Sequence, residues 1–365
     1  MPESDSSLTY AGIDSRRLSR AIDVLKRGID EGALPGGVVC AARRERVFVH
    51  RALGTIDGKK PVDPDTIYDL ASITKPMATA SSVLALAEQG KLALAATLGA
   101  LLENVPKRLV DATVHQLLTH ASGLPAHTNC FERGRGIDAA IETILAQPTQ
   151  TRGSAYAYSC LGFILLGRIV ELVSGLSLDG FARANIFDPL GLSCDVTFTP
   201  DASLRPRIAL TKSREKALPG ESDENTLLGI VNDGNCRAIG GVAGNAGLFG
   251  TAHDVLKFGE GILHRTPKLF GAPTTDRVLK NQLDPKIGAH TLMFFAQGNG
   301  LCPAGDLLSP HAVGHSGFTG NVLTIDPQYD LTVVVLTNRV YSSGNAAPWL
   351  SARRRFLNAL ASAID

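Results

Sequence analysis

Hydrophobic residues recur at helical spacing close to the start of the chain. The repeating positions are Leu18, Ile22, Leu25 and Ile29. Asp14 precedes them and is of a residue type that often caps a helix, while Gly32 follows them as a stop signal. The spacing therefore predicts a helix between these two residues. Two β-rich runs, 37–42 and 46–53, come next and flank a polar turn, which predicts a hairpin.

The middle and the end of the chain differ in their pattern. Four segments in the middle have helical composition and spacing: 72–89, 137–147, 159–173 and 178–186. Three β-rich runs near the end predict consecutive strands: 313–318, 321–325 and 331–336. Residues 347–364 predict a closing helix, and the polar, proline-containing segment 195–235 predicts a long loop.

This order of elements predicts an α/β chain of the α+β type. An antiparallel sheet flanked by helices is formed from both chain ends, and a mostly helical part is inserted between them. We expect a sheet domain that comprises residues 1–75 and 236–365, and a mainly helical insertion domain that comprises residues 76–235.

Charge and hydropathy narrow the classes of partner. Lys and Arg together number 36 and Asp and Glu 35, so the formal net charge is only +1. This balance argues against coating nucleic acid or an anionic membrane. Apolar runs stay well below the roughly 20 residues that cross a bilayer. We therefore expect no nucleic-acid partner and no membrane span.

The N-terminal residues and the cysteines bear on location. Residues 1–7 lack the basic and apolar regions of a signal peptide. Six cysteines are scattered without C-x-x-C spacing, which favours free thiols in a reducing cytosol. We expect a cytoplasmic protein. The alternative is an exported protein whose leader has been removed and which holds one or two disulfides.

One tetrapeptide has the composition of a nucleophilic centre. Ser72 and Lys75 form an S-x-x-K pattern at the start of a predicted helix, which places both side chains on one face. The positive helix end would stabilise a developing alkoxide, and the amine could help to remove the hydroxyl proton. A chain of this length carries roughly one such pattern by chance. By itself it is better explained by a capping serine and a solvated lysine.

Further segments in a fixed order give the pattern more weight. Residues 158–160 read Tyr-Ser-Cys and open a predicted helix, and residues 315–317 read His-Ser-Gly in a late predicted strand. This order resembles the serine β-lactamase and penicillin-binding-protein superfamily. The segments LLTHASGLP at 117–125, GVAGNAGLF at 241–249 and GHSGFTG at 314–320 resemble its class C branch, which includes esterases, D-aminopeptidases and transesterases. The resemblance runs from about residue 15 to 360.

The resemblance implies a role for each matching residue. Ser72 would be the acylated nucleophile, and Lys75 and Tyr158 would share the work of the base. A neighbouring ammonium lowers the pKa of a phenol, so we expect this pair to titrate as a coupled unit. The backbone N–H groups of Ser72 and Phe318 would form the oxyanion hole. Gly317 would leave room for a substrate along the strand, and no metal or cofactor is implied.

Two positions depart from the family pattern. Cys160 stands where the family usually has Asn or Asp, and a thiol is a poor hydrogen-bond donor. It is either a weakened substrate contact or a small buried residue without a catalytic part. His315 stands where penicillin-recognising members commonly have Lys, and a histidine is mostly neutral near pH 7. With Ser316 and Gly317 it would contact substrate. Both departures favour an ester hydrolase.

Other short motifs do not support a different kind of catalytic or binding site. Ser122 and Ser316 lack the G-x-S-x-G context of an α/β-hydrolase, and the glycines of 241–250 match no nucleotide-binding pattern. The sequence thus predicts a serine hydrolase that acts through an acyl-enzyme on small carboxylic esters. The first alternative is the same chemistry on an amide, namely a β-lactam, a D-amino-acid peptide or an acyl transfer. The second is a catalytically inactive binding homologue.

Overall fold

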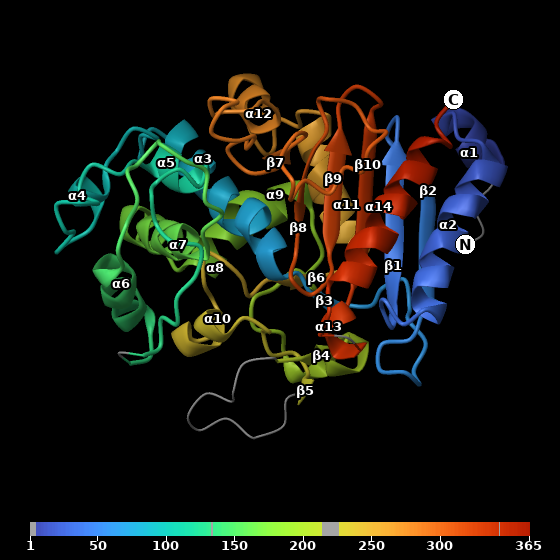
Figure 1. Ribbon diagram of the computed structural model, residues 1–365, viewed down its shortest axis with the longest axis horizontal. Helices are drawn as coiled ribbons and strands as arrows, with labels where there is room; N and C mark the ends of the chain where they lie inside the picture. The colour runs from blue at the N-terminus through green and yellow to red at the C-terminus, as the bar shows by residue number, and fades with distance from the viewer. Residues whose placement is uncertain (1–4, 133, 214–225, 343) are drawn as a thin grey trace.

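A six-stranded antiparallel sheet forms the centre of the structure (Figure 1). The computed structural model describes residues 5–132, 134–213, 226–342 and 344–365. The sheet has the order β2-β1-β10-β9-β8-β7. Its strands are β1 (Gly36–Arg43), β2 (Arg46–Gly54), β7 (Phe295–Ala296), β8 (Val313–Ser316), β9 (Val322–Asp326) and β10 (Leu331–Thr337). Two further strand pairs are β3 (Tyr68–Asp69) with β6 (Phe249–Gly250), and β4 (Thr211–Lys212) with β5 (Thr226–Leu227).

The two chain ends meet in the middle of this sheet. β1 pairs with β10 so that Gly37 lies opposite Thr337 and Cys40 lies opposite Val334. The ends themselves are adjacent as well, since the Asp14 N–H donates to the Ala363 carbonyl at 2.8 Å. The predicted sheet from both chain ends and the α/β fold class are confirmed.

Helices cover both faces of the sheet, so that its strands β1, β9 and β10 are buried on both sides. Along β1, Val39 belongs to a core cluster with Leu18 and Trp349, whereas Val38 belongs to a second cluster with Phe258. This alternation follows from the two-residue period of a strand. α2 (Ser15–Asp30) and α14 (Ala347–Ala361) therefore pack on one face, and α11 (Ala252–Leu263) packs on the other.

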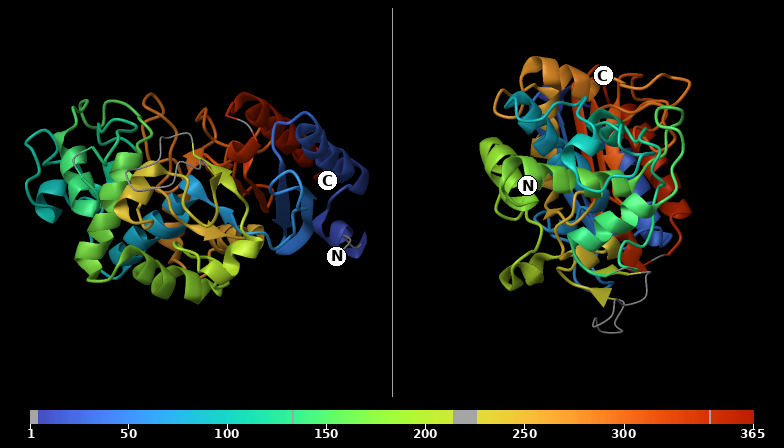
Figure 2. Two further views of the ribbon diagram at one scale, coloured as in Figure 1. Left: turned by 90° about the horizontal axis from the view of Figure 1, so that it is seen from below. Right: turned by 90° about the vertical axis from the view of Figure 1, so that its left-hand side faces the viewer.

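The remaining helices lie mostly beside the sheet, as the views in Figure 2 show. α7, an apolar helix, is buried at the centre of this helical part, and Gly175 ends it in the left-handed conformation with a φ of 73°. The helices other than α2, α11 and α14 are α1 (Asp5–Ala11), α3 (Ser81–Glu88), α4 (Leu98–Leu101), α5 (Val114–Leu118), α6 (Ile137–Ala146), α7 (Cys160–Ser174), α8 (Leu178–Ala182), α9 (Asp188–Leu190), α10 (Gly234–Ile239), α12 (Ala272–Leu279) and α13 (Arg339–Ser342).

One buried cluster runs through both parts of the molecule. It contains Val38 of the sheet, Leu165 of α7 and Phe258 of α11. Gly244 lies so close to α7 that a Cβ there would be 1.9 Å from the Phe163 carbonyl oxygen, which explains the glycine-rich segment as a packing element. The division into a sheet domain of 1–75 and 236–365 and a helical domain of 76–235 remains our proposal.

Two predicted segments differ from the structure. The predicted helix 72–89 consists of a 3₁₀ turn at Ala71–Ile73, a π-helical turn at Lys75–Ala80 and then α3. The predicted loop 195–235 contains short elements, namely a 3₁₀ segment at Ala202–Arg207, strands β4 and β5 and the start of α10. Residues 214–225 of that loop lie outside the described residues.

Within the described ranges, no individual helix combines the length and apolar composition needed to cross a bilayer. α7 and Leu178–Leu190 meet that requirement only when they are joined across a bend of 75°.

Candidate active site

The start of the helical segment after β3 places Ser72 at a sharp turn. Ala71 has a φ of 48°, a left-handed conformation that costs energy for a residue with a Cβ. The Asp69 carboxylate supports this turn, since its Oδ1 accepts a hydrogen bond from the Ala71 N–H at 2.9 Å. Ser72 itself is partly exposed, so its hydroxyl is accessible while the surrounding backbone is fixed.

Lys75 lies one turn further along and is fully buried. Its Nζ donates to Ser72 Oγ at 3.1 Å, to the Asn245 carbonyl at 3.0 Å and to Cys160 Sγ at 3.4 Å. These contacts direct all three ammonium protons toward fixed partners. The amine is therefore positioned against the serine hydroxyl, as the S-x-x-K pattern predicts.

Tyr158 reaches the same place from the chain that leads into α7. The Ser159 side chain caps α7, and the Ser159 N–H donates to His120 Nδ1 at 3.0 Å. These bonds fix the backbone on the C-terminal side of the tyrosine. The Lys75 Nζ lies 5.1 Å from the centre of the Tyr158 ring. The structure thus brings the hydroxyl of Ser72 and the amine of Lys75 close to the phenol of Tyr158. Ser72 and Tyr158 are 86 positions apart in the sequence.

Burial sets the protonation of this pair. Burial raises the pKa of Tyr158 and outweighs the Lys75 ammonium and the hydrogen bonds with Lys75 and Ser72, which lower it. For Lys75, burial lowers the pKa, but its interactions with Cys160 and Tyr158 are larger in sum and raise it. The lowering that the sequence predicts for Tyr158 is therefore present but is not dominant. At neutral pH the resting site holds an ammonium and a neutral phenol.

Ser72 and Tyr158 open onto a cavity of about 290 Å³, whereas Lys75 is buried and is not part of its described lining. Ser72, Tyr158, Cys160 and Phe318 all line it. Its other lining residues are Ala71, His127, Ser213, Asn232, Asp233 and Ala246. Phe318 is 51% exposed, so its ring forms part of the mouth of this cavity. Cys160 is the sole departure from the family pattern that faces it, and its thiol contacts the amine of Lys75.

The strand residues expected to contact substrate lie differently. His315 is 1% exposed and is not part of the described cavity lining. Its ring instead stacks on that of Phe295, with 4.6 Å between the ring centres. Burial and the Lys75 charge hold the pKa of His315 well below its usual range. Ser316 lines a neighbouring cavity that α14 borders. At Gly317 a Cβ would lie 2.7 Å from the Leu70 carbonyl, so this glycine allows β8 to approach the Ser72 turn.

Two supporting residues, Asp69 and His120, are not among the predicted site residues. Asp69 Oδ2 accepts from the Asn232 N–H at 2.7 Å, so one carboxylate joins the Ser72 turn to the part of the cavity lining that contains Asn232. The Asp69 backbone carbonyl accepts hydrogen bonds from Thr319 Oγ1 at 2.9 Å and from Asn321 Nδ2 at 2.7 Å. Asp69 therefore also holds the turn between β8 and β9. His120 packs against the Tyr158 ring at 4.6 Å. A short buried strand just before S-x-x-K is the signal that could have indicated Asp69.

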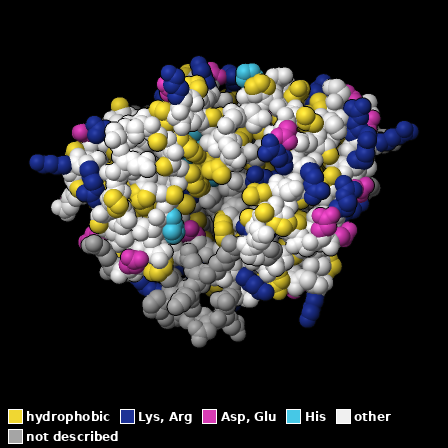
Figure 3. All heavy atoms as spheres, viewed as in Figure 1, with side chains coloured by type: hydrophobic (Ala, Val, Ile, Leu, Met, Phe, Trp, Pro, Cys, Tyr) yellow, Lys and Arg dark blue, Asp and Glu magenta, His cyan; other side chains and the backbone are white. Residues whose placement is uncertain are grey.

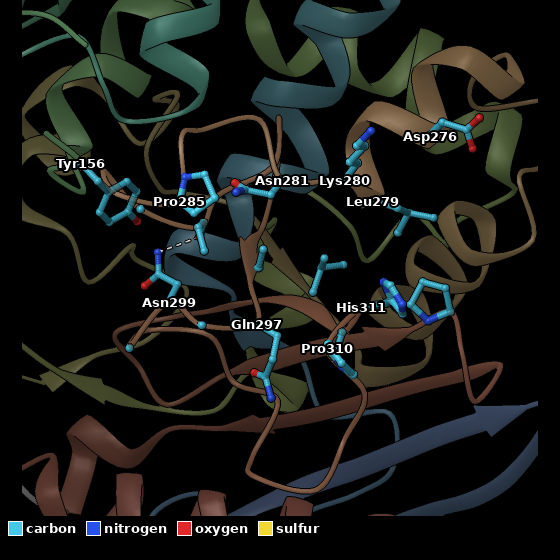
Figure 4. A pocket seen from close by; sticks show the side chains of 18 of the residues that line it. Tyr156, Asp276, Leu279, Lys280, Asn281, Pro285, Gln297, Asn299, Pro310 and His311 are labelled. Carbon is cyan, nitrogen blue, oxygen red and sulfur yellow. Dashed lines mark hydrogen bonds between the residues drawn. The ribbon is translucent and has the colours of Figure 1, made fainter. Parts of the chain in front are cut away.

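A larger cavity of about 1080 Å³ lies between α12, the segment 281–300 and the start of β8 (Figure 4). Tyr156, Lys280 and His311 contribute to its lining from different segments. Its described lining contains none of Ser72, Lys75 or Tyr158, so it is distinct from the nucleophile cavity. Among the described residues no cluster of His, Cys, Asp or Glu has the arrangement of a metal site.

Solved structures with the same fold include several hydrolases. EstCE1, described as a hydrolase with promiscuous acyltransferase activity, superposes with a TM-score of 0.75 at 22% identity, covering 94% of this chain and 99% of that one. A class C β-lactamase from Rhodobacter sphaeroides superposes with a TM-score of 0.72 at 21% identity, and the superposition covers 93% of this chain and 98% of that one. At these identities the likeness concerns the fold alone.

Sequence relatives and a family model extend this likeness. A protein of Salmonella paratyphi A named putative D-alanyl-D-alanine carboxypeptidase is 28% identical over 92% of this chain and 86% of its own length. A protein of Salmonella agona with the same name matches to the same extent. A family model described as Beta-lactamase matches residues 21–356. The chain therefore belongs to the Beta-lactamase family, and the serine hydrolase class that its motifs predict is confirmed.

Proposed function

We propose that this protein cleaves carboxylic esters through an acyl-enzyme formed on Ser72. The observation that carries the proposal is the contact of 3.1 Å between Lys75 Nζ and Ser72 Oγ beside Tyr158, at the edge of a cavity. A hydroxyl needs a nearby base to become a nucleophile, and this pair supplies one when it has lost a proton. The cytoplasmic location stays a prediction.

The reaction would proceed in two halves. Ser72 Oγ attacks the ester carbonyl carbon while its proton passes to the Lys75–Tyr158 pair, and the N–H groups of Ser72 and Phe318 stabilise the oxyanion. The carbon–oxygen bond to the alcohol then breaks, and the alcohol leaves with that proton. A water molecule attacks the acyl-enzyme, gives its proton to the same pair and releases the acid. Ser72 Oγ leaves the acyl carbon and takes the proton that the water gave to the pair.

The cavity wall supports an ester over a β-lactam or peptide. An amide substrate needs its N–H and C=O held by fixed polar groups, and the Cys160 thiol is a weak partner for both. A penicillin also carries a carboxylate, yet the described lining of this cavity contains no Lys or Arg. An ester needs neither contact, because its alcohol is a better leaving group than an amine.

Hydrolysis of short-chain p-nitrophenyl esters by the wild type and by Ser72→Ala tests this function. We expect kcat/KM to fall by at least about 10³-fold in the variant, since triad-type nucleophiles contribute that much or more. Equal rates in the two proteins would remove Ser72 from the reaction.

Amide cleavage is the second candidate because the Salmonella relatives bear a carboxypeptidase name at 28% identity. A panel of nitrocefin, a D-alanyl-D-alanine peptide and a p-nitrophenyl ester separates the two. Faster turnover of nitrocefin or of the peptide would favour the amide. An inactive binding homologue is the third candidate, and it would be supported if a fluorophosphonate probe failed to label the protein.

A further inference from the structure

The described lining of the cavity beside Ser72 contains an acidic side chain but no Lys or Arg. This side chain is the carboxylate of Asp233. The cations near it are buried behind the wall: Lys75 is 0%, Arg237 9% and Arg339 2% exposed. All three donate to backbone carbonyls, which satisfies part of their hydrogen-bonding capacity inside the protein. Asp233 is therefore the charge that this wall presents to a substrate.

The Asp233 carboxylate has acceptor capacity to spare. Its Oδ1 accepts from the Cys236 N–H at 2.8 Å and caps α10. Within the described ranges its Oδ2 accepts no hydrogen bond, and the carboxylate makes no ion pair with Lys, Arg or His. An ionised carboxylate can accept several hydrogen bonds, so a carboxylate that lines a substrate cavity favours a cationic group there.

The position of Asp233 relative to the nucleophile is fixed. Asp69 accepts hydrogen bonds from the Ala71 and Asn232 N–H groups at 2.9 and 2.7 Å. Ala71 directly precedes Ser72, and Asn232 directly precedes Asp233. One buried carboxylate thus holds both the nucleophile and Asp233 in the lining of the same cavity, which is the arrangement of a specificity residue rather than of a surface charge.

We propose that Asp233 selects substrates that carry a cationic group, such as a substituted ammonium, next to the scissile carbonyl. The inference rests on the proposed function, since the substrate in question is the one that acylates Ser72. Asp233 makes no contact in the chemistry itself. It discriminates by charge, and a neutral substrate of the same shape gains nothing from it.

Two isosteric pairs of esters test this. Betaine p-nitrophenyl ester and 3,3-dimethylbutanoyl p-nitrophenyl ester differ by a charge on the acyl side. Butyrylcholine and 3,3-dimethylbutyl butyrate differ in the same way on the alcohol side. The cationic-to-neutral ratio of kcat/KM is measured for each pair in the wild type, in Asp233→Asn and in Asp14→Asn, with Ser72→Ala as the background. Asn also caps helices, so Asp233→Asn retains the α10 cap.

Asp14→Asn is the matched control, because Asp14 caps α2 outside the cavity and accepts from the Arg17 N–H at 2.7 Å. We expect the ratio for one pair to fall at least about tenfold in Asp233→Asn and to stay unchanged in Asp14→Asn. The pair that responds identifies the side of the ester that occupies the cavity. Ratios that agree within twofold in all three proteins, with the neutral esters still hydrolysed, would overturn the Asp233 proposal alone. No turnover of any ester would overturn the proposed function with it.

Inhibition of the unaltered protein gives a second readout that needs no variant. Choline should inhibit hydrolysis of the neutral p-nitrophenyl ester competitively, and 3,3-dimethylbutan-1-ol, its uncharged isostere, should inhibit at least about tenfold more weakly. Equal inhibition by the two compounds would contradict a role for charge in this cavity.

Discussion

At the residue scale, the unusual group in the site is the Cys160 thiol. It lines the cavity and lies 3.4 Å from the Lys75 amine, so a bulky group on its sulfur would fill the space beside Ser72. We expect a maleimide to reduce ester turnover by more than about tenfold, and Cys160→Ala to abolish this sensitivity.

Cys194 supplies the control for this experiment, since it is an exposed free cysteine outside the cavity lining. Cys194→Ala should leave the inhibition unchanged. If Cys160→Ala stayed as sensitive as the wild type, the inhibitory thiol would lie elsewhere.

The protonation of the Lys75–Tyr158 pair predicts the pH dependence. The pKa values of Lys75 and Tyr158 are both raised, so at neutral pH both groups are protonated. The pair must lose one proton before it can act as a base. The fraction that has lost this proton grows tenfold per pH unit below the pKa. We expect kcat/KM for a neutral ester to rise steadily from pH 6 to pH 9.

Tyr158→Phe removes one member of the pair and should both lower kcat/KM and change this profile. A profile that is flat from pH 6 to pH 9 in the wild type would show that the pair does not need to lose a proton.

At the scale of elements, local patterns predict the regular helices and strands well. Leu18 and its periodic partners form the buried face of α2, and Trp349 and Phe356 of α14 are buried as core residues. The strands at the two ends pair as the hydrophobic runs indicate. Such patterns do not predict turn geometry. The positive φ of Ala71 and the π-helical turn after Ser72 depend on the hydrogen bond to Asp69 and on packing against residues distant in sequence.

The site was predictable only where a motif marks it. Ser72 and Lys75 meet Tyr158 because two separate segments converge, and the resemblance supplied that order. Nothing in the sequence around His315 indicates that it stacks on Phe295, since β7 is a strand of two residues. The same applies to Asp233, whose place in the cavity of Ser72 depends on the hydrogen bond between its neighbour Asn232 and Asp69.

The glycine-rich segment 241–250 makes a packing prediction. In Gly244→Ala the new Cβ would lie 1.9 Å from the Phe163 carbonyl oxygen, which forces the segment away from α7. We expect the free energy of unfolding to fall by about 1–3 kcal/mol in urea titrations.

Gly300→Ala is the matched control, because its Cβ would have no neighbour within 4 Å. It should change stability by less than about 0.5 kcal/mol. Equal stability of Gly244→Ala and wild type would mean that this contact relaxes without cost.

At the scale of the whole molecule, Asp69 connects the parts that form the site. Burial raises the pKa of its carboxyl to about 6, against hydrogen bonds from Asn232 and Ala71 that lower it. A raised pKa means that the protonated form is favoured in the folded state. Its contribution to stability is therefore full below the ordinary value of 3.8 and is lost as the pH rises through about 6.

The free energy of unfolding of the wild type should accordingly lose about 2–3 kcal/mol from this group between pH 4 and pH 7. Asp69→Asn should lack this component, and its slope of stability against pH should differ from that of the wild type over this range. Parallel slopes would contradict the assignment. The variant should also lose ester turnover, because an amide cannot accept from both N–H groups.

The surface charge of the molecule is nearly balanced in sum but is unevenly distributed. Lys and Arg side chains gather toward the sheet end of the face in Figure 3, whereas hydrophobic side chains are frequent along its middle. With a net charge of +1, the molecule has little long-range attraction for anions. Selectivity must therefore come from contacts within the cavity.

The most direct measurement is the intact mass of the protein during turnover of a slowly hydrolysed ester, followed by mapping of the modified peptide. We expect the addition of one acyl group, located on Ser72 and absent in Ser72→Ala. An adduct on another residue, or turnover of the ester in the absence of any adduct on rapid quenching, would contradict the proposed acyl-enzyme.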